Sequence, residues 1–297
     1  MHASPLTWVT RVLWVLLPVT LGAALDGALS GSGSGAGPHG TTGAVILAWA
    51  VWAVGLFASF VQLPVALTVL RIVVPLPLVA GVIATITEPP GALGWVGMAV
   101  AAVVAVTAMS AQVGDDFVNG SSYGDERRLA LRPPMPLLLG PIQVVWICTA
   151  LPVPVAIVLL SDGQRVGGGV MAVVGVGLAV VGFRALDRLT RRWLVLVPAG
   201  LTIVDPMALA EPILLRRSSI IRLGPAPADT DALDLSANAA GLILQADLSE
   251  PVELVPATTR RDGVAEPTTT TSVLVAPSRP GEMLAAAEER RIAVGRT

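Results

Sequence analysis

The sequence has no lysine, one cysteine and only two histidines in 297 residues. Cys148 has no partner for an intrachain disulfide, so no disulfide framework holds this fold. The histidines, His2 and His39, are far apart and belong to no HExxH motif, and a CxxC motif is absent. We therefore expect no catalytic site that depends on histidine or cysteine, and no metal or cofactor.

Charged residues are also scarce. They make up 13% of the chain, whereas a soluble globular protein has about 25%. Hydrophobic residues make up 54%, and the mean hydropathy is +0.74. So few charges cannot cover a surface that faces water, which excludes an ordinary soluble protein. The formal net charge of -2 also excludes the broad basic surface by which proteins bind nucleic acid.

What the sequence has instead is a series of long apolar runs. A bilayer core about 30 Å thick needs roughly 20 apolar residues of helix. The runs are 8–25, 43–61, 66–86, 95–113, 137–160 and 167–183. They predict an α-helical polytopic membrane bundle of about six helices over residues 1–186. The first run could instead be a cleaved signal peptide, but no basic residue precedes Arg11, which favours a retained helix.

The arginines of the short loops predict the orientation of this bundle. Loops 26–42 and 87–94 contain none, whereas loop 114–134 and the segment after the sixth run are rich in them. Because arginine-rich loops stay in the cytoplasm, we expect both termini there. Basic side chains next to a membrane also attract anionic lipid. The arginines expected at the membrane surface are Arg184, Arg188, Arg191 and Arg192.

Small residues form a stripe along the sixth run. They recur every three or four residues, which places them on one side of a helix. The stripe consists of Gly168, Ala172, Gly175, Ala179 and Gly182. Small side chains let two helices approach closely in lipid. We expect the stripe to pack inside the bundle; a homodimer through the sixth helix is the alternative.

A polar segment, DDFVNGSSYGDERRLALRPP at 115–134, separates the fourth and fifth runs. Its carboxylates could hold a cation, but their spacing does not match an EF-hand loop. Ser121, Ser122 and Tyr123 could serve a catalytic loop, yet no general base is identifiable, and the glycines lack the lysine of a phosphate-binding loop. We expect a docking loop, packed on the bundle or the tail, whose acids pair with its arginines. Its candidate residues are Asp115, Asp116, Tyr123, Asp125, Glu126, Arg127, Arg128 and Arg132.

From residue 187 onward, short β-like runs alternate with turns. WLVLV (193–197) and LTIVD (201–205) predict a hairpin, and ILLRRSSIIRL (213–223) predicts a longer strand with a bulge. The further expected elements are strands at 232–236, 241–246, 252–255 and 272–276, a mobile loop at 256–271 and a helix at 278–293. These elements predict a small β-rich cytoplasmic domain over 187–297.

This tail resembles the pleckstrin-homology-like domains attached to bacterial membrane proteins. The resemblance rests on the hairpin RRWLVLVPAGLTIVD, the strand RRSSIIRL and the closing VLVAPSRPGEMLAAAEERR, and it covers about residues 190–293. It implies a split β-barrel with a C-terminal helix and a docking or regulatory role; a β-sandwich is the alternative. Lipid-binding members carry basic residues in the first hairpin loop. Here that loop is Pro198-Ala199-Gly200, so phosphoinositide binding is not expected.

Together these features predict a non-enzymatic protein of a bacterial inner membrane. All 19 basic residues are arginine, which is typical of GC-rich, actinobacterial-type genomes. We expect a scaffold, sensor or accessory subunit that contacts the lipid bilayer and, through its tail, another protein. The alternative is a small-solute transporter or channel component, because prolines interrupt the third and fifth runs and broken helices can mark transport sites.

Overall fold

The chain folds into two compact units, a helical unit and a β unit. The computed structural model describes residues 3–22, 25, 38–87, 89, 91–257 and 267–295. The helical unit consists of Met1–Phe117 and Gln143–Leu186, and the β unit of Val118–Ile142 and Asp187–Thr297. The sequence-based boundary kept 118–142 with the bundle, whereas its contacts place it in the β unit. The chain therefore passes between the two units three times.

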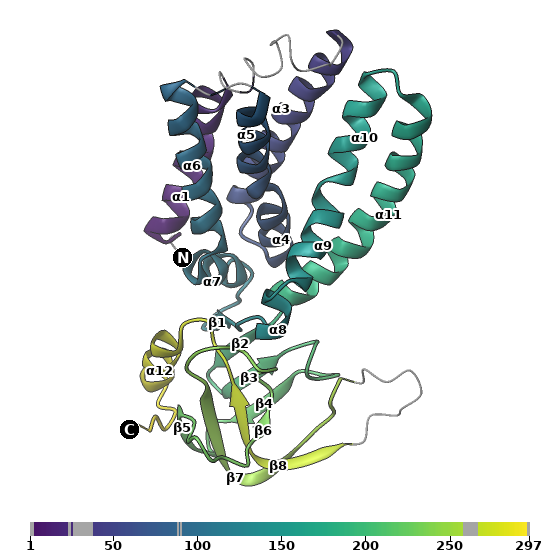
Figure 1. The fold of residues 1–297 in the computed structure, drawn as a ribbon. Coiled ribbons are helices and arrows are strands. Elements are labelled where there is room, and N and C mark those ends of the chain that lie inside the picture. Colours follow the sequence, from purple (N-terminus) through teal and green to yellow (C-terminus); the bar gives the residue numbers. More distant parts are fainter. Residues whose placement is uncertain are drawn as a thin grey trace. The chain divides into compact units, whose positions relative to one another are not determined.

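The helical unit is built from long apolar helices (Figure 1). Its helices are α1 (Pro5–Thr20), α3 (Pro38–Phe60), α4 (Pro64–Val73), α5 (Pro75–Thr87), α6 (Ala92–Met109), α7 (Ala111–Asn119), α9 (Pro141–Ala150), α10 (Pro152–Ser161) and α11 (Arg165–Thr190). Several begin at proline, which suits the first turn of a helix because that position needs no N–H donor. α6 ends at Met109, because the backbone of the next residue, Ser110, is extended. The Ser110 hydroxyl accepts the Val113 N–H at 3.3 Å, so α7 begins as a separate helix.

Five helical spans among the described residues are long and apolar enough to cross a membrane. They are Thr42–Phe60, Pro64–Ile86, Ala92–Met109, Pro141–Ser161 and Arg165–Thr190. The first predicted span corresponds to α1, which is apolar but has only 16 residues, fewer than the roughly 17 to 25 of a typical span. Only 17 to 33% of the most apolar stretch of each span is buried. Lipid, not water, suits so much exposed apolar surface, so this is an integral membrane protein.

Two of these spans are kinked at proline. Pro75 follows the end of α4 at Val73, and Pro152 follows the end of α9 at Ala150. The helical hydrogen bonding continues up to each kink, because the Val74 N–H donates to the Leu70 carbonyl at 2.9 Å. In the other span, the Leu151 N–H donates to the Ile147 carbonyl at 3.1 Å. The breaks are therefore bends, of the kind that a missing proline N–H causes, and not unwound segments.

A pair of tryptophans joins α1 to α3. The indole N–H of Trp14 donates to the Trp52 carbonyl at 2.9 Å, and the indole N–H of Trp52 donates to the Trp14 carbonyl at 3.0 Å. Gly55 lies against the Trp14 ring, where a Cβ atom would be 2.3 Å from the nearest carbon. Glycine is therefore required at this crossing, and both indole donors are satisfied away from water.

The β unit contains two four-stranded sheets. Its strands are β1 (Arg127–Ala130), β2 (Trp193–Val197), β3 (Gly200–Val204), β4 (Ile213–Arg216), β5 (Ile220–Pro225), β6 (Leu233–Asp234), β7 (Leu244–Leu254) and β8 (Thr268–Val275). The first sheet has the order β1-β2-β3-β4 and the second the order β5-β7-β8-β6. Two helices, α8 (Met135–Leu138) and α12 (Pro280–Glu289), complete the unit.

The first strand of this unit comes from the polar segment. β1 pairs antiparallel with β2, so that Arg128 lies opposite Val195. β2 and β3 then form the expected hairpin, but its turn has two residues, Pro198 and Ala199, because Val197 already pairs with Gly200. Part of the predicted docking loop is therefore a strand of the β unit, and the chain continues from this segment into the helical unit in both directions.

Two predicted strands have different boundaries in the structure. The expected strand 213–223 is divided by a turn, so that β4 belongs to the first sheet and β5 to the second. The expected strands 241–246 and 252–255 are parts of the single strand β7, whose register shifts between Asp247 and Val252. Within the predicted loop 256–271, residues 258–266 lie outside the described residues, and β8 begins at Thr268.

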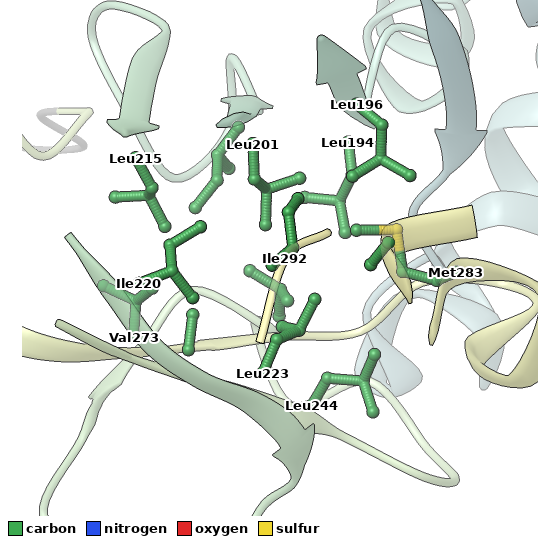
Figure 2. Packing of buried hydrophobic residues seen from close by; sticks show 14 of the residues in the cluster. Leu194, Leu196, Leu201, Leu215, Ile220, Leu223, Leu244, Val273, Met283 and Ile292 are labelled. Carbon is green, nitrogen blue, oxygen red and sulfur yellow. The ribbon is translucent and has the colours of Figure 1, made fainter. Parts of the chain in front are cut away.

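One hydrophobic core joins both sheets and the C-terminal helix (Figure 2). Leu194, Leu201 and Leu215 enter it from the first sheet, and Leu223 and Leu244 from the second. The core also contains Met283, Ala286 and Ala287 of α12, followed by Ile292. Each fully buried leucine contributes about 1.5 to 3 kcal/mol, so this cluster holds β1 and α12 in the same cooperative unit as the central strands.

Candidate docking site

The two central strands of the first sheet, β2 and β3, are largely apolar on both faces. Side chains alternate along a strand, so Leu194 and Leu196 of β2 enter the core while its other residues face outward. A sheet face exposed to water is normally polar. The outer positions of β2 and β3 are instead Trp193, Val195, Val197, Thr202 and Val204. Val195 is buried and the other four side chains are half-buried, so this outer face is apolar and only partly exposed.

A shallow hollow with a volume of about 280 Å³ lies on this outer face. Its lining residues are Glu126, Arg128, Trp193, Val195, Val197, Thr202 and Val204. Sites for small-molecule ligands usually measure about 300 to 1,000 Å³. The hollow is therefore at the lower limit of the usual size range of such sites.

Arg128 forms the polar wall of the hollow. Its Nη1 donates to the Ser121 hydroxyl at 2.8 Å, and its Nη2 donates to the Glu126 carboxylate at 3.1 Å. The guanidinium carbon lies 5.8 Å from the centre of the Trp193 ring, within the range of a cation–π contact. Among the described residues, the buried Nε of Arg128 has no hydrogen-bond partner.

Asn119 fixes the main chain of Arg128. Its side-chain carbonyl accepts the Arg128 N–H at 2.8 Å, and its amide nitrogen donates to the Arg128 carbonyl at 2.5 Å. A neighbouring strand would form the same pair of bonds, so this side chain takes the place of a strand beside β1. Farther along, the Ser278 N–H donates to the Ala130 carbonyl at 2.8 Å. The outer edge of β1 is thus covered.

The lining of the hollow suits binding rather than covalent chemistry. Among the described residues that line it, Thr202 supplies a hydroxyl and Glu126 a carboxylate that pairs with Arg128, and none is a histidine or cysteine. Within the described ranges, no group of three or more histidine, cysteine or acidic residues could hold a metal ion. The hollow therefore has an apolar floor beside one cation and one anion.

One motif in the polar segment was overlooked by the sequence analysis. Residues 120–124, Gly-Ser-Ser-Tyr-Gly, fit the G-x-S-x-G pattern of a nucleophile elbow. An elbow requires a strand before the serine and a helix after it, whereas this stretch follows α7 and forms turns. The Ser122 hydroxyl donates to the Asn119 carbonyl at 2.6 Å, and Tyr123 is 87% exposed. The local structure is therefore that of a turn and not of an elbow.

The acids at the start of the polar segment lie in the helical unit. Asp116 accepts the Ser4 N–H at 2.8 Å and the Thr7 hydroxyl at 2.5 Å, at the beginning of α1. A carboxylate is stabilised there by the helix dipole. Asp115 is buried and interacts electrostatically with Arg71 of α4. The expected pairing with arginines of the polar segment is therefore not what holds these two acids.

The other candidates of the polar segment lie in the β unit and hold it together. Glu126 pairs with Arg128 in the hollow, as described above. Arg127 forms an ion pair with Glu282 of α12. Arg290, just after that helix, donates to the Asp125 carbonyl at 2.9 Å. Arg132 donates to two main-chain carbonyls in the loop before β7, at 2.8 and 3.2 Å. These contacts join the segment to α12 and to the second sheet.

Arg192 does not face a membrane surface, so that part of the prediction is wrong. Its side chain is 1% exposed, and its Nε and Nη2 donate to the two carboxylate oxygens of Asp205 at 2.8 and 2.6 Å. Its Nη1 donates to the Arg132 carbonyl at 3.0 Å. A buried guanidinium needs such partners because burial removes its water. Arg192 therefore ties together β2, β3 and the residues that follow β1.

The three other arginines of that prediction are exposed. Arg184 and Arg188 lie on α11 near its end, and Arg191 follows it. Arg191 donates to Asp187 at 2.6 Å, one helical turn earlier. These side chains are free of any core packing, so they stay candidates for contact with lipid headgroups.

The small-residue stripe packs against α9 and α10 of the same chain. Gly168, Gly175 and Gly182 are buried, while Ala172 and Ala179 are half-buried. Added Cβ atoms at the three glycines would lie 2.7, 2.9 and 1.8 Å from Leu160, Pro152 and Thr149, respectively. A homodimer through this stripe would have to displace α9 and α10.

The chain matches no family model, no curated protein and no solved structure. What the fold and the site define is a class, an integral membrane protein with a β unit of two sheets and a hollow on the outer face of the first.

Proposed function

We propose that this membrane protein acts as a docking protein, namely a scaffold, sensor or accessory subunit, whose β unit binds a protein partner. The observation that carries this proposal is the apolar outer face of the first sheet with Arg128 at the wall of its hollow. An apolar residue of the partner would fill the hollow, and a neighbouring carbonyl or carboxylate would accept from the accessible part of the Arg128 guanidinium, whose side chain is 19% exposed. Such a contact combines apolar burial with one oriented polar bond.

The arrangement of the β unit supports a pleckstrin-homology-like fold. Two sheets share one core, and α12 follows the last strand, as the resemblance implies. The first strand is supplied by the polar segment, which is a departure from a self-contained tail. The hairpin turn Pro198-Ala199 carries no basic residue. We therefore favour a protein over an inositol phosphate as the bound partner.

The arrangement of arginines supports a location in a bacterial inner membrane with both termini in the cytoplasm. Exposed arginines lie in the last turns of α11 and directly after it, and loop 26–42 has no arginine. In this proposal α1 is a sixth, short span, and the β unit lies on the cytoplasmic side.

Site-specific photo-crosslinking in native membranes tests the docking role. A benzophenone amino acid at Thr202, inside the hollow, should yield a crosslinked product that contains another protein. The same probe at Ile221, which is 60% exposed on β5 of the second sheet, is the matched control and should not. Arg128→Ala should weaken the product at Thr202, because it removes the polar wall. Equal products at both positions, or none at Thr202, would rule the proposal out.

A small-solute transporter or channel component is the second candidate, favoured by the two kinked spans. The continuous hydrogen bonding at Val74 and Leu151 supports bending rather than an ion site made of unwound backbone. Solute flux in proteoliposomes that is lost on substitution of Arg71 or Gln143 would reverse the ranking of the two functions.

A further inference from the structure

The strand β4 forms an open edge of the first sheet. The opposite edge, β1, is covered by Asn119 and by the main chain at Ser278. In the second sheet, residues 293–295 bond to Leu223 of β5, and β6 has only two residues. In the part of the chain that the structure describes, β4 is thus a sheet edge whose outer side is not covered by such contacts.

The direction of the main-chain groups along β4 follows from one hydrogen bond. The Arg217 N–H donates to the Ala199 carbonyl at 2.8 Å, toward β3. Main-chain groups alternate in direction along a strand, so those of Leu215 also face β3, and those of Leu214 and Arg216 face the open edge. Among the described residues, the N–H groups of Leu214 and Arg216 have no main-chain partner on that side.

Two further details make this edge unusual. Pro212 offers a carbonyl to the open side but no N–H, because proline has no main-chain donor. The Arg216 carbonyl is already occupied, since it accepts the Ser219 N–H at 2.9 Å in the following turn. The open edge of β4 therefore lacks the main-chain donor at Pro212, and its main-chain acceptor at Arg216 is already hydrogen-bonded.

The geometry points to a second copy of this chain as the partner of β4. In an antiparallel pairing that sets Leu214 opposite Leu214, the N–H and carbonyl of each Leu214 bond to those of the other copy. Pro212 then lies opposite Arg216, so that the Arg216 N–H donates to the Pro212 carbonyl. The donor that Pro212 lacks falls opposite the carbonyl that Arg216 has already committed. Every main-chain group of the pairing is thus satisfied.

The side chains match in the same register. Leu214, which is 42% exposed, meets its own copy on the outer face. Glu211 of each copy lies opposite Arg217 of the other copy, so this charge pair occurs at both ends of the paired strands. Both residues are exposed. Opposite charges across paired strands stabilise a sheet, whereas like charges destabilise it. In the neighbouring register that sets Leu215 opposite Leu215, Arg217 would instead lie opposite Ile213, and this complementarity is lost.

The same features disfavour other strands. Proline and arginine at an edge normally discourage pairing with foreign strands, but here they complement a copy of themselves. Four-residue edges bind weakly in free solution. Confinement of both copies to one membrane raises their effective concentration and favours the pairing. This inference concerns β4 and is independent of what occupies the hollow.

Cysteine crosslinking of the full chain in its membrane tests the pairing. In a Cys148→Ala background, Leu214→Cys should give a dimer with a short bis-maleimide, since paired Cβ atoms lie about 4.5 to 5.5 Å apart. Leu242→Cys is the matched control, because Leu242 is 47% exposed but lies outside β4. Glu211→Arg or Arg217→Glu, each added to Leu214→Cys, should lower the dimer yield about tenfold, as like charges then face each other.

Mixing the two charge variants separates this register from any other contact. Copies with Glu211→Arg should crosslink to copies with Arg217→Glu as well as the parent chains do, because both pairs are attractive again. Unchanged hydrogen exchange of the core strand β7 shows that the variants remain folded. Equal yields at residues 214 and 242, no response to charge, or no recovery on mixing would overturn the inference.

Discussion

Replacement of Arg192 by methionine would measure how far the β unit depends on its buried ion pair. The side chains of Arg192 and Asp205 are 1% and 0% exposed. The carboxylate accepts two bonds from Arg192 and a third from the Met207 N–H at 3.0 Å. Without the arginine, a buried carboxylate keeps one of its three bonds. Removing one partner of a buried pair costs about 3 to 5 kcal/mol, a large share of the 5 to 15 kcal/mol by which domains are stable.

The preceding arginine offers a matched control. Arg191 pairs with Asp187 at 2.6 Å, the same distance as the shorter contact of Arg192, but its side chain is 53% exposed. Exposed pairs contribute about 0 to 1 kcal/mol because water screens them. Arg191→Met should therefore cost less than about 1 kcal/mol, although it removes the same group from the adjacent position.

Hydrogen–deuterium exchange of the full chain in lipid nanodiscs can follow the β unit separately. A loss of 3 to 5 kcal/mol corresponds to roughly 150- to 5,000-fold faster exchange in peptides from β2 and β3. Peptides from α6 should exchange as before, since they belong to the other unit. The double variant Arg192→Met with Asp205→Leu should recover much of the protection, because no charge is then buried alone.

Two results would refute this reasoning. If Arg192→Met and Arg191→Met accelerated exchange by the same small factor, burial would not determine the contribution of the pair. If the double variant were no more protected than the single one, the loss would come from packing around Arg192 and not from an unpaired carboxylate.

Two other features lead to predictions about packing and strand pairing. Gly182→Leu should reduce the yield of monodisperse protein in size-exclusion chromatography, since its Cβ would lie 1.8 Å from Thr149; Gly177→Leu, with nothing within 4 Å, should not. Asn119→Leu should destabilise β1 by about 1 to 3 kcal/mol, because it removes both bonds to Arg128. That loss would appear as faster exchange in the β1 peptide, and an unchanged rate would show that Asn119 does not hold the strand.

The hairpin of β2 and β3 shows how much of the fold can be predicted from local sequence patterns. Both strands were expected within one residue of their observed bounds. The turn was taken as three residues, whereas two residues form it. With a turn of two residues, the register places Arg192 opposite Asp205 on the core-facing side. The buried pair could therefore have been predicted from the sequence. Turn length sets hairpin register, and a difference of one residue concealed the central ion pair.

The strand β1 and the hollow beside it could not be predicted in this way. Arg127–Ala130 is short and begins with two arginines, which is typical of a loop. Its partner β2 is more than sixty residues away, beyond two membrane spans. Strand propensity depends on such distant neighbours. Trp193 and Asn119 acquire their roles only once β1 is in place, so both were absent from the expected site.

The three crossings between the units have a consequence for synthesis on the ribosome. β1 leaves the ribosome long before β2, the strand that it needs. At about 5 to 20 residues per second, the gap between Ala130 and Trp193 lasts roughly 3 to 13 seconds. During that interval the two spans Pro141–Ser161 and Arg165–Thr190 must enter the membrane while β1 has an unpaired side. Nascent β1 therefore waits for its partner strand until β2 is made, and a gene fragment that starts after α11 would encode a sheet without its first strand.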